Sequence, residues 1–166
     1  MFVAEGEKIV NELLNSKFEI EHIYATKLFS GINNCKKSAM TSVSKDELLK
    51  ISSLVSPNNV LAIVKITHQE VEKKSGITLV LDDINDPGNL GTIIRMCDWF
   101  GVKKLICSKS TVDCYNPKVV QSAMGSLFRI DIKYLDLTNY LANINTSIYG
   151  AYMQGSDVKN QDFCSD

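Results

Sequence analysis

The sequence lacks the patterns that mark metal sites, disulfides and membrane spans. Its two histidines, His22 and His68, are isolated, which argues against a zinc site or a Ser-His-Asp hydrolase. Its five cysteines include no Cys-x-x-Cys pair and leave an odd one over, so we expect buried thiols. No apolar run approaches the length of a membrane span, and residues 2–10 hold three charged side chains, which excludes a signal peptide. We expect no metal and a cytoplasmic protein.

Charge is also nearly balanced. The net charge is −1 and the isoelectric point is about 6.1, which argues against a protein that grips nucleic acid by bulk electrostatics but leaves a local patch possible. Only two of the 18 basic residues are arginines, Arg95 and Arg129. Both lie in the two segments described next. The hydrophobic fraction of 45% is that of an ordinary globular protein, and 166 residues suffice for one large or two small domains.

Residues 77–100, ITLVLDDINDPGNLGTIIRMCDWF, predict a strand, a tight turn and a helix. The apolar run 77–81 is typical of a strand buried on both faces. Asp86-Pro87-Gly88-Asn89 supplies turn chemistry, and apolar residues recur at helical spacing from Leu90. This places Asn89 in the turn and Arg95 in the second helical turn. On these residues alone, a capping Asn and a solvated Arg are the favoured interpretation.

Residues 112–128, VDCYNPKVVQSAMGSLF, repeat the design after an expected strand at 104–108. Asn116 is a natural N-cap, and Pro117 suits the first helical position. Lys118 follows the cap, where helix-end N–H groups and one lysine could meet a phosphate, with a solvated lysine as an equal alternative. We expect Gly125 to permit close packing.

These segments carry a family resemblance. DDINDPGNLGTIIRMCDWFG and VDCYNPKVVQSAMGSLFR closely resemble the first two motifs of the SpoU-type (TrmH-like) RNA 2′-O-methyltransferases of the SPOUT superfamily. FVAEGEKIV resembles the opening of their substrate-binding domain. The matches come in the family's order and cover residues 2 to about 155.

The resemblance implies an α/β fold in two parts. Residues 1–70 would form a small α/β substrate-binding domain, 71–76 a linker, and 77–166 an open parallel-sheet SPOUT methyltransferase domain with helices on both faces. The family continues through a third motif that threads a trefoil knot and completes the S-adenosylmethionine pocket. We find no such motif after residue 154, so we expect a member whose knot-forming C-terminal part is missing.

The resemblance also assigns roles to residues. It makes Arg95 the catalytic arginine, which would anchor phosphate and stabilise the reacting 2′-oxygen, and Asn89 its partner. S-adenosyl-L-methionine is the implied cofactor, and Ala151, Tyr152 and Met153 would end a strand at its pocket. Lys118 would contact RNA, either ribosomal or transfer RNA. The family also forms homodimers, so we expect self-association, while Arg129 is interpreted as an ordinary charge.

The remaining chain predicts alternating helices and short strands. We expect helices at 1–14 and 44–51, strands at 18–25, within 36–43 and at 60–66, and helical or irregular structure at 28–34. Beyond the second motif we expect a strand at 130–135, a helix at 138–144 capped by Thr138, and a strand at 147–152. The Ser44-Lys45-Asp46-Glu47 stretch matches a capping box.

Three functions compete. The first is an S-adenosylmethionine-dependent RNA 2′-O-methyltransferase. The second is a non-catalytic RNA-binding or assembly protein that retains the fold without the knot. The third is a nucleotide-binding oxidoreductase, which the sequence disfavours because its Gly-x-Gly-x-x-Gly turn is absent: DPGNLG has glycines only at Gly88 and Gly91.

Overall fold

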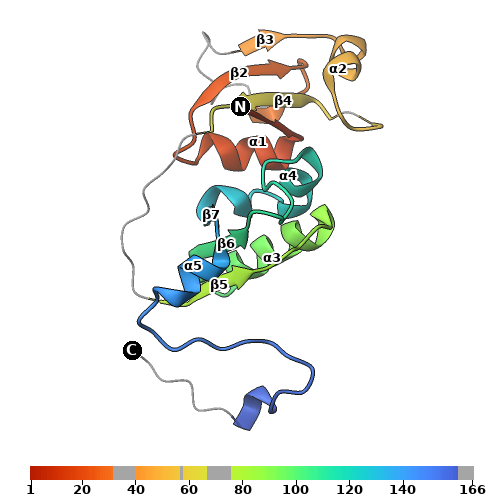
Figure 1. The fold of residues 1–166 in the computed structure, drawn as a ribbon. Coiled ribbons are helices and arrows are strands. Elements are labelled where there is room, and N and C mark those ends of the chain that lie inside the picture. The colour runs from red at the N-terminus through yellow and green to blue at the C-terminus, as the bar shows by residue number, and fades with distance from the viewer. Residues whose placement is uncertain (32–39, 57, 67–75, 161–166) are drawn as a thin grey trace. The chain divides into compact units, whose positions relative to one another are not determined.

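A computed structural model describes residues 1–31, 40–56, 58–66 and 76–160. The chain falls into two compact units, Met1–Leu135 and Asp136–Asp166. The first unit holds two sheets, with strands β1–β4 before residue 65 and β5–β7 after residue 77 (Figure 1). The linker expected at 71–76 lies outside the described residues except for Gly76.

The first sheet has the strand order β1-β4-β2-β3. β4 pairs antiparallel with both β1 and β2, whereas β2 and β3 are parallel. Its elements are β1 (Phe2–Glu5), α1 (Glu7–Leu14), β2 (Ile20–Ala25), β3 (Met40–Ser42), α2 (Lys45–Ile51) and β4 (Val60–Val64). At α2 the predicted capping box is confirmed, because Ser44 Oγ accepts from Glu47 N and the Glu47 carboxylate accepts from Ser44 N.

The helix predicted over residues 1–14 is wrong in its first half. Residues Phe2–Glu5 form strand β1, and the helix begins only at Glu7. Gly6 makes the turn between them at φ +99°, a conformation that β-branched and bulky residues avoid. β1 is needed to complete the sheet, since its backbone pairs with β4 from Phe2↔Val64 to Glu5↔Leu61. Tertiary pairing therefore overrides the helical periodicity of this stretch.

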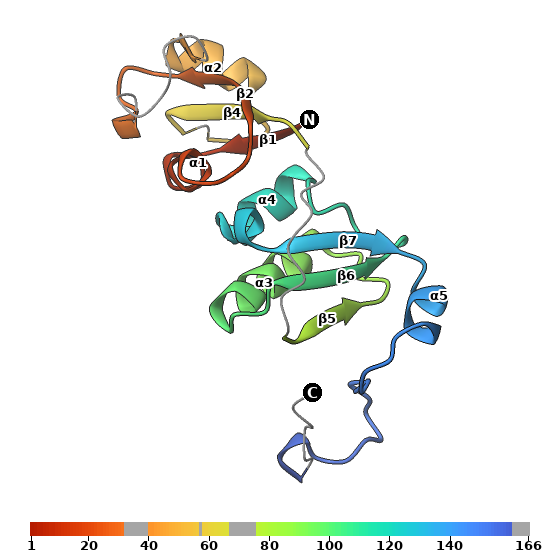
Figure 2. The ribbon, with the colours of Figure 1, turned by 90° about the vertical axis from the view of Figure 1, so that its left-hand side faces the viewer.

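The second sheet is parallel, in the order β5-β6-β7, as predicted. Its elements are β5 (Thr78–Leu81), α3 (Pro87–Trp99), β6 (Lys104–Ser108), α4 (Pro117–Ala123), the 3-10 helix η3 (Ser126–Arg129) and β7 (Asp131–Leu135). Because the strands follow in sequence order, right-handed crossovers place α3 and α4 on the same face. The expectation of helices on both faces is wrong for the described part of this unit. β5 is an edge strand and half-buried, not buried on both faces (Figure 2).

Helix α3 begins three residues earlier than predicted. Asp86 is its N-cap, with its carboxylate accepting from Asn89 N at 2.7 Å, and Pro87 takes the first helical position. The same arrangement recurs at α4, where Asn116 caps and Pro117 follows, as predicted. Asn89 therefore lies within the first turn of α3 and not in the preceding loop, and Arg95 lies more than two turns into the helix.

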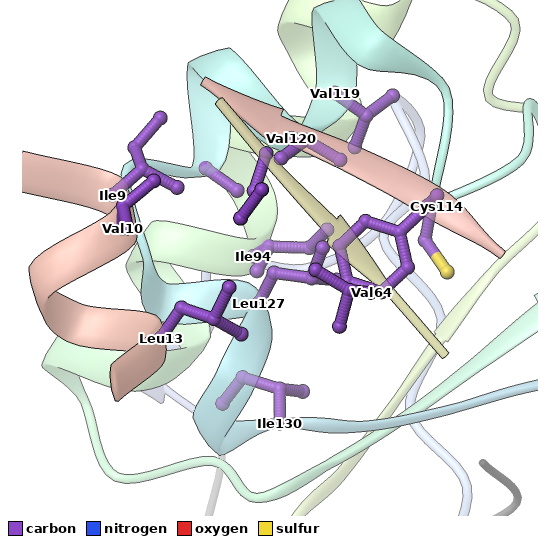
Figure 3. Close-up of a cluster of buried hydrophobic side chains, with 14 of the residues drawn as sticks. Ile9, Val10, Leu13, Val64, Ile94, Cys114, Val119, Val120, Leu127 and Ile130 are labelled. Carbon is purple, nitrogen blue, oxygen red and sulfur yellow. The ribbon is translucent and has the colours of Figure 1, made fainter. Parts of the chain in front are cut away.

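The two sheets share one hydrophobic core. Side chains from α1, β4, α3, α4 and η3 are fully or nearly fully buried together (Figure 3), among them Val10, Leu13, Val64, Ile94, Val120 and Leu127. Beside this cluster the ring of Phe2 stacks on Tyr115, with ring centroids 4.7 Å apart. Gln121 Nε2 also donates to the backbone carbonyl of Glu5 at 2.9 Å. Helix α4 is thus hydrogen-bonded directly to strand β1.

The described residues of the second unit, 136–160, have little regular structure. They contain helix α5 (Leu137–Ala142) and the 3-10 helix η4 (Val158–Asn160). Asp136, not Thr138, caps α5, because its carboxylate accepts from Asn139 N at 3.0 Å. The strand predicted at 147–152 is wrong, since these residues form neither strand nor helix.

Candidate functional site

The predicted catalytic pair lies on the exposed side of α3. Asn89 and Arg95 are both exposed. Thr92, which is also exposed, lies midway between them, three residues from each along the helix. Asn89 donates its backbone N–H to Asp86, and no hydrogen bond joins its side chain to Arg95 among the described residues. Asn89 and Arg95, expected as partners, thus share the exposed side of the helix without a hydrogen bond between their side chains.

The two arginines differ in what they bind. Among the described residues, Arg95 has no hydrogen bond or ion pair to any side chain. Arg129 binds two carboxylates: its Nη2 lies 2.7 Å from Asp98 Oδ2 and its Nη1 2.6 Å from Glu12 Oε2. The interpretation of Arg129 as an ordinary charge is therefore wrong. The guanidinium of Arg95 is left available for a ligand.

The environment of Asp98 explains how this ion pair is held. Burial alone would raise the pKa of Asp98, but hydrogen bonds from Arg129 and Ser126, together with the charges of Arg129 and Lys103, outweigh it and lower that pKa. The hydrogen bonds to Asp98 in turn raise the pKa of Arg129. Sequence reasoning missed this contact because its three residues are far apart in the chain.

Lys118 lies in the first turn of α4 and is exposed. Its carbonyl accepts from Ser122 Oγ at 2.8 Å, and the same hydroxyl lies 3.1 Å from the carbonyl of Pro87, the first residue of α3. Ser122 thus connects α4 to the amino end of α3. The approach is close because Gly91 has no β-carbon: such an atom would lie 2.9 Å from Ala123 N. Gly125 also permits close packing, as expected, with Glu12 Cγ 2.9 Å from the position of its β-carbon.

The carboxyl edge of the second sheet is organised by hydroxyl groups that sequence reasoning missed. Ser108, at the end of β6, has its Oγ 2.9 Å from Asp83 N and 3.1 Å from Thr111 Oγ1. The hydroxyl of Tyr134 accepts from Cys114 N and donates to the carbonyl of Val112, both at 2.7 Å. These bonds fix the loops after β5 and β6 beside α3 and α4. Ser and Thr directly after a buried strand were the available signal.

An open cavity lies on the first sheet. It has a volume of about 430 Å³ and is lined by Thr26, Lys27, Leu28, Ser42, Val43, Ser44, Lys45 and Asn59. Its wall combines two exposed lysines with the apolar side chains of Leu28 and Val43. A second cavity of about 260 Å³ is lined by Lys109, Thr111, Asp113 and Tyr134 at the carboxyl edge of the second sheet. Arg95 lines neither.

The cysteines lie where their sequence context indicated. Cys97, Cys107 and Cys114 are buried free thiols, and burial raises the pKa of Cys107 to about 11 and that of Cys114 to about 12. They are therefore protonated and unreactive near neutral pH. Cys35 and Cys164 lie outside the described residues. Within the described ranges, no three His, Cys, Asp or Glu side chains are grouped as metal ligands.

The predicted cofactor residues lie in the second unit. Ala151, Tyr152 and Met153 are all exposed, Tyr152 by 74% and Met153 fully. Side chains this open do not fit an enclosed pocket formed by their own segment. No step of a reaction is therefore assigned to these residues.

Two family models match the chain. Residues 76–166 match the SpoU rRNA Methylase family, and residues 1–62 match the MRM3-like substrate binding domain. The chain belongs to the SpoU rRNA methylase family. The resemblance seen in the two motifs is confirmed.

Curated relatives and solved structures agree with this assignment. Mitochondrial rRNA methyltransferase 3 of Xenopus laevis is 31% identical over 78% of this chain and 34% of its own length. The 23S rRNA (guanosine(2553)-2′-O)-methyltransferase RlmP of Bacillus subtilis is 28% identical, over 92% and 63%. A structure described as a TrmH-family RNA methyltransferase from Porphyromonas gingivalis superposes with a TM-score of 0.85 at 28% identity, over 98% of this chain and 66% of that one.

The S-adenosylmethionine-bound rRNA methyltransferase of Sinorhizobium meliloti gives a TM-score of 0.72 at 26% identity, over 85% of this chain and 56% of that one. The α/β fold with its parallel sheet is thus that of SPOUT methyltransferases. The chain spans between one third and two thirds of the length of the two curated relatives. Among the described residues, no helix is long and apolar enough to cross a membrane.

Proposed function

We propose that this chain supplies the RNA-binding sheet and part of the catalytic sheet of an S-adenosylmethionine-dependent rRNA 2′-O-methyltransferase. One observation carries the proposal. Arg129 forms ion pairs with two carboxylates, whereas Arg95, on helix α3, is exposed and pairs with no described side chain. An exposed, unpaired guanidinium is suited to bind phosphate and to stabilise a developing alkoxide.

The two sheets divide the work in this proposal. Residues 1–70 form the substrate-binding domain and residues 77–166 the methyltransferase domain, in keeping with the separate family matches. The 430 Å³ cavity of the first sheet receives part of the RNA, with Lys27 and Lys45 for phosphates and Leu28 and Val43 beneath a ribose or base. Lys118 offers a further phosphate contact at the start of α4.

Arg95 and Asn89 act on the target ribose. Arg95 holds the neighbouring phosphate and stabilises the 2′-oxygen as it loses its proton, while the Asn89 amide, on the same exposed side of α3, orients the nucleotide. S-adenosylmethionine supplies the methyl group when bound, and we assign Ala151, Tyr152 and Met153 to one wall of its site. The relative from Sinorhizobium meliloti, solved with this cofactor, supports S-adenosylmethionine as the methyl donor.

The favoured substrate is ribosomal RNA, because RlmP and the mitochondrial relatives are named for it. We further propose that the protein acts in the cytoplasm and that it is a homodimer. Trp99 and Phe100, which are 85% and 75% exposed at the end of α3, would then be covered by the second copy.

The deciding experiment is transfer of a radiolabelled methyl group from S-adenosylmethionine to protein-free ribosomal RNA by the complete protein. We expect label in a 2′-O-methylnucleoside after digestion. RNA binding without methyl transfer would instead favour the non-catalytic RNA-binding protein. That alternative is suggested by the open position of residues 151–153, and calorimetry of S-adenosylmethionine binding separates the two cases.

A further inference from the structure

The Arg129 ion pair joins helices that belong to different sheets. Glu12 lies on α1, which packs with the first sheet, and Asp98 lies on α3, which packs with the second. Arg129 Nε donates to Asp98 Oδ2 at 2.8 Å while Nη1 donates to Glu12 at 2.6 Å. Lys103 Nζ adds a longer contact of 3.6 Å to Asp98. One guanidinium therefore links α1 and α3 directly.

The link lies close to the proposed catalytic arginine. Asp98 follows Arg95 by three residues, which is about one turn along the same helix. On the other side, η3 approaches α1 so closely that a β-carbon on Gly125 would meet Glu12. The planar fork of arginine can bind two carboxylates at once, which a lysine ammonium does less rigidly.

We propose that Arg129 is a positioning residue, which holds α1 against α3 and thereby sets the separation between the first sheet and Arg95. The inference rests on the proposed function, in which one RNA contacts both. An RNA anchored in the Lys27–Lys45 cavity then presents to Arg95 only the nucleotide that lies at the matching distance. Arg129 thus contributes to the choice of target nucleotide without touching it.

The informative variant is Glu12→Gln. It preserves side-chain volume and leaves the Arg129–Asp98 pair intact, so only the charge of the contact with α1 is removed. The pair is about 40% exposed on both sides, and exposed pairs contribute little to global stability, so the variant folds. Asp46→Asn is the matched control, because Asp46 is an exposed carboxylate on α2 and its substitution makes the same change in charge.

The first measurement is the distance distribution between spin labels at Lys50 on α2 and Lys109 after β6, in the complete protein. The labels are attached through non-cysteine chemistry so that the native thiols remain. We expect a broader distribution in Glu12→Gln than in wild type or Asp46→Asn. High salt should broaden the wild-type distribution, because it screens this exposed pair. An unchanged distribution in Glu12→Gln would overturn the proposal.

The second measurement compares two RNAs. A long RNA reaches both the first-sheet cavity and Arg95, whereas a short hairpin holds only the target loop. For Glu12→Gln we expect the methylation rate on the long RNA at saturation to fall on the order of 10-fold, less than the 10²-fold that a misplacement of about 1 Å can cost. The rate on the hairpin should not change. Equal losses on both RNAs would show a general structural defect and refute positioning. If wild type methylates neither RNA, the proposed function fails, and the label distances alone decide the role of Arg129.

Discussion

Ser122 occupies the space that a β-carbon on Gly91 would need, with its own Cβ 2.7 Å from that position. Gly91→Ala should therefore destabilise the protein, although alanine is the better helix former by about 0.8–1 kcal/mol. Overpacking costs about 1–3 kcal/mol, and at so closed a contact we expect the upper end of that range, which leaves a net loss of about 2 kcal/mol. The free energy of unfolding in urea measures it.

Gly150→Ala is the control for this substitution. A β-carbon at Gly150 meets no atom within 4 Å, so the same added methyl group enters open space. We expect its unfolding free energy to match that of wild type. Equal unfolding free energies for Gly91→Ala and Gly150→Ala would contradict the close approach of α3 and α4.

Arg95→Lys keeps the charge but loses the planar fork. If Arg95 stabilises the reacting oxygen, the single-turnover rate of methyl transfer should fall by roughly 10²–10³, as on loss of one oxyanion donor. Affinity for S-adenosylmethionine should not change, because the arginine is assigned to RNA. Arg129→Lys is unsuitable as a control because Arg129 is a structural link. Met96→Leu serves instead, as an exposed neighbour on the same helix. Equal rates for Arg95→Lys and wild type would end the assignment.

Replacing Lys27 and Lys45 with glutamine tests the RNA surface of the first sheet. Each lost phosphate contact to single-stranded RNA should reduce the slope of log affinity against log salt by about 0.7. Lys118→Gln should reduce it once more if Lys118 contacts phosphate. Lys17→Gln, on an exposed lysine outside the cavity, is the control. Filter binding over a series of salt concentrations gives the slopes, and identical slopes for all variants would exclude these contacts.

Glu5 is a buried carboxylate with three hydrogen-bond donors. It is 3% exposed and accepts from Ser53 N at 3.0 Å, from Ser53 Oγ at 2.6 Å and from Ser52 Oγ. Glu5→Gln turns one acceptor oxygen into a donor, so we expect a loss of about 1.5–3 kcal/mol in unfolding free energy. Glu19→Gln, which affects only a surface pair with Lys65, should cost at most about 1 kcal/mol. Comparable losses in both would contradict the burial of Glu5.

The lowered pKa of Asp98 makes part of the stability dependent on pH. Because the folded pKa lies below the unfolded value, the contribution is complete above about pH 4 and is lost as the pH falls through the folded pKa. Asp98→Asn should therefore be less stable than wild type at neutral pH and should converge with it in acid. Urea unfolding across this range measures the difference, with Asp46→Asn as the reference. A constant difference at every pH would rule out the linkage.

Local patterns predicted the second sheet well. The predicted strands at 77–81 and 104–108 correspond to β5 and β6, and the Asn116-Pro117 cap begins α4, as predicted. The start of α3 could have been predicted too, because Asp86-Pro87 repeats the cap and proline of α4. It was missed because Asp-Pro-Gly-Asn also fits a turn.

Long-range features were beyond sequence reasoning. Phe2–Glu5 carries helical periodicity, but pairing with β4 makes it a strand. The three members of the Arg129 ion pair come from positions 12, 98 and 129, and nothing local relates them. For the candidate site, the position of Arg95 on a helix followed from its neighbours. Its lack of a partner among the described side chains required the structure.

The pairing of β1 with β4 has a consequence for the order of folding. In the first sheet Phe2 pairs with Val64, so the paired strands are far apart in the sequence. In the second sheet β5 pairs with β6, from Thr78↔Lys104 to Leu81↔Cys107, and only one helix lies between them in the chain. Closing the larger loop costs more chain entropy, and the cost is incurred before the contacts form. During synthesis the first strand must also wait, unpaired, until the fourth has emerged. The amino-terminal residues of β1 are thus among the last to pair in the first sheet.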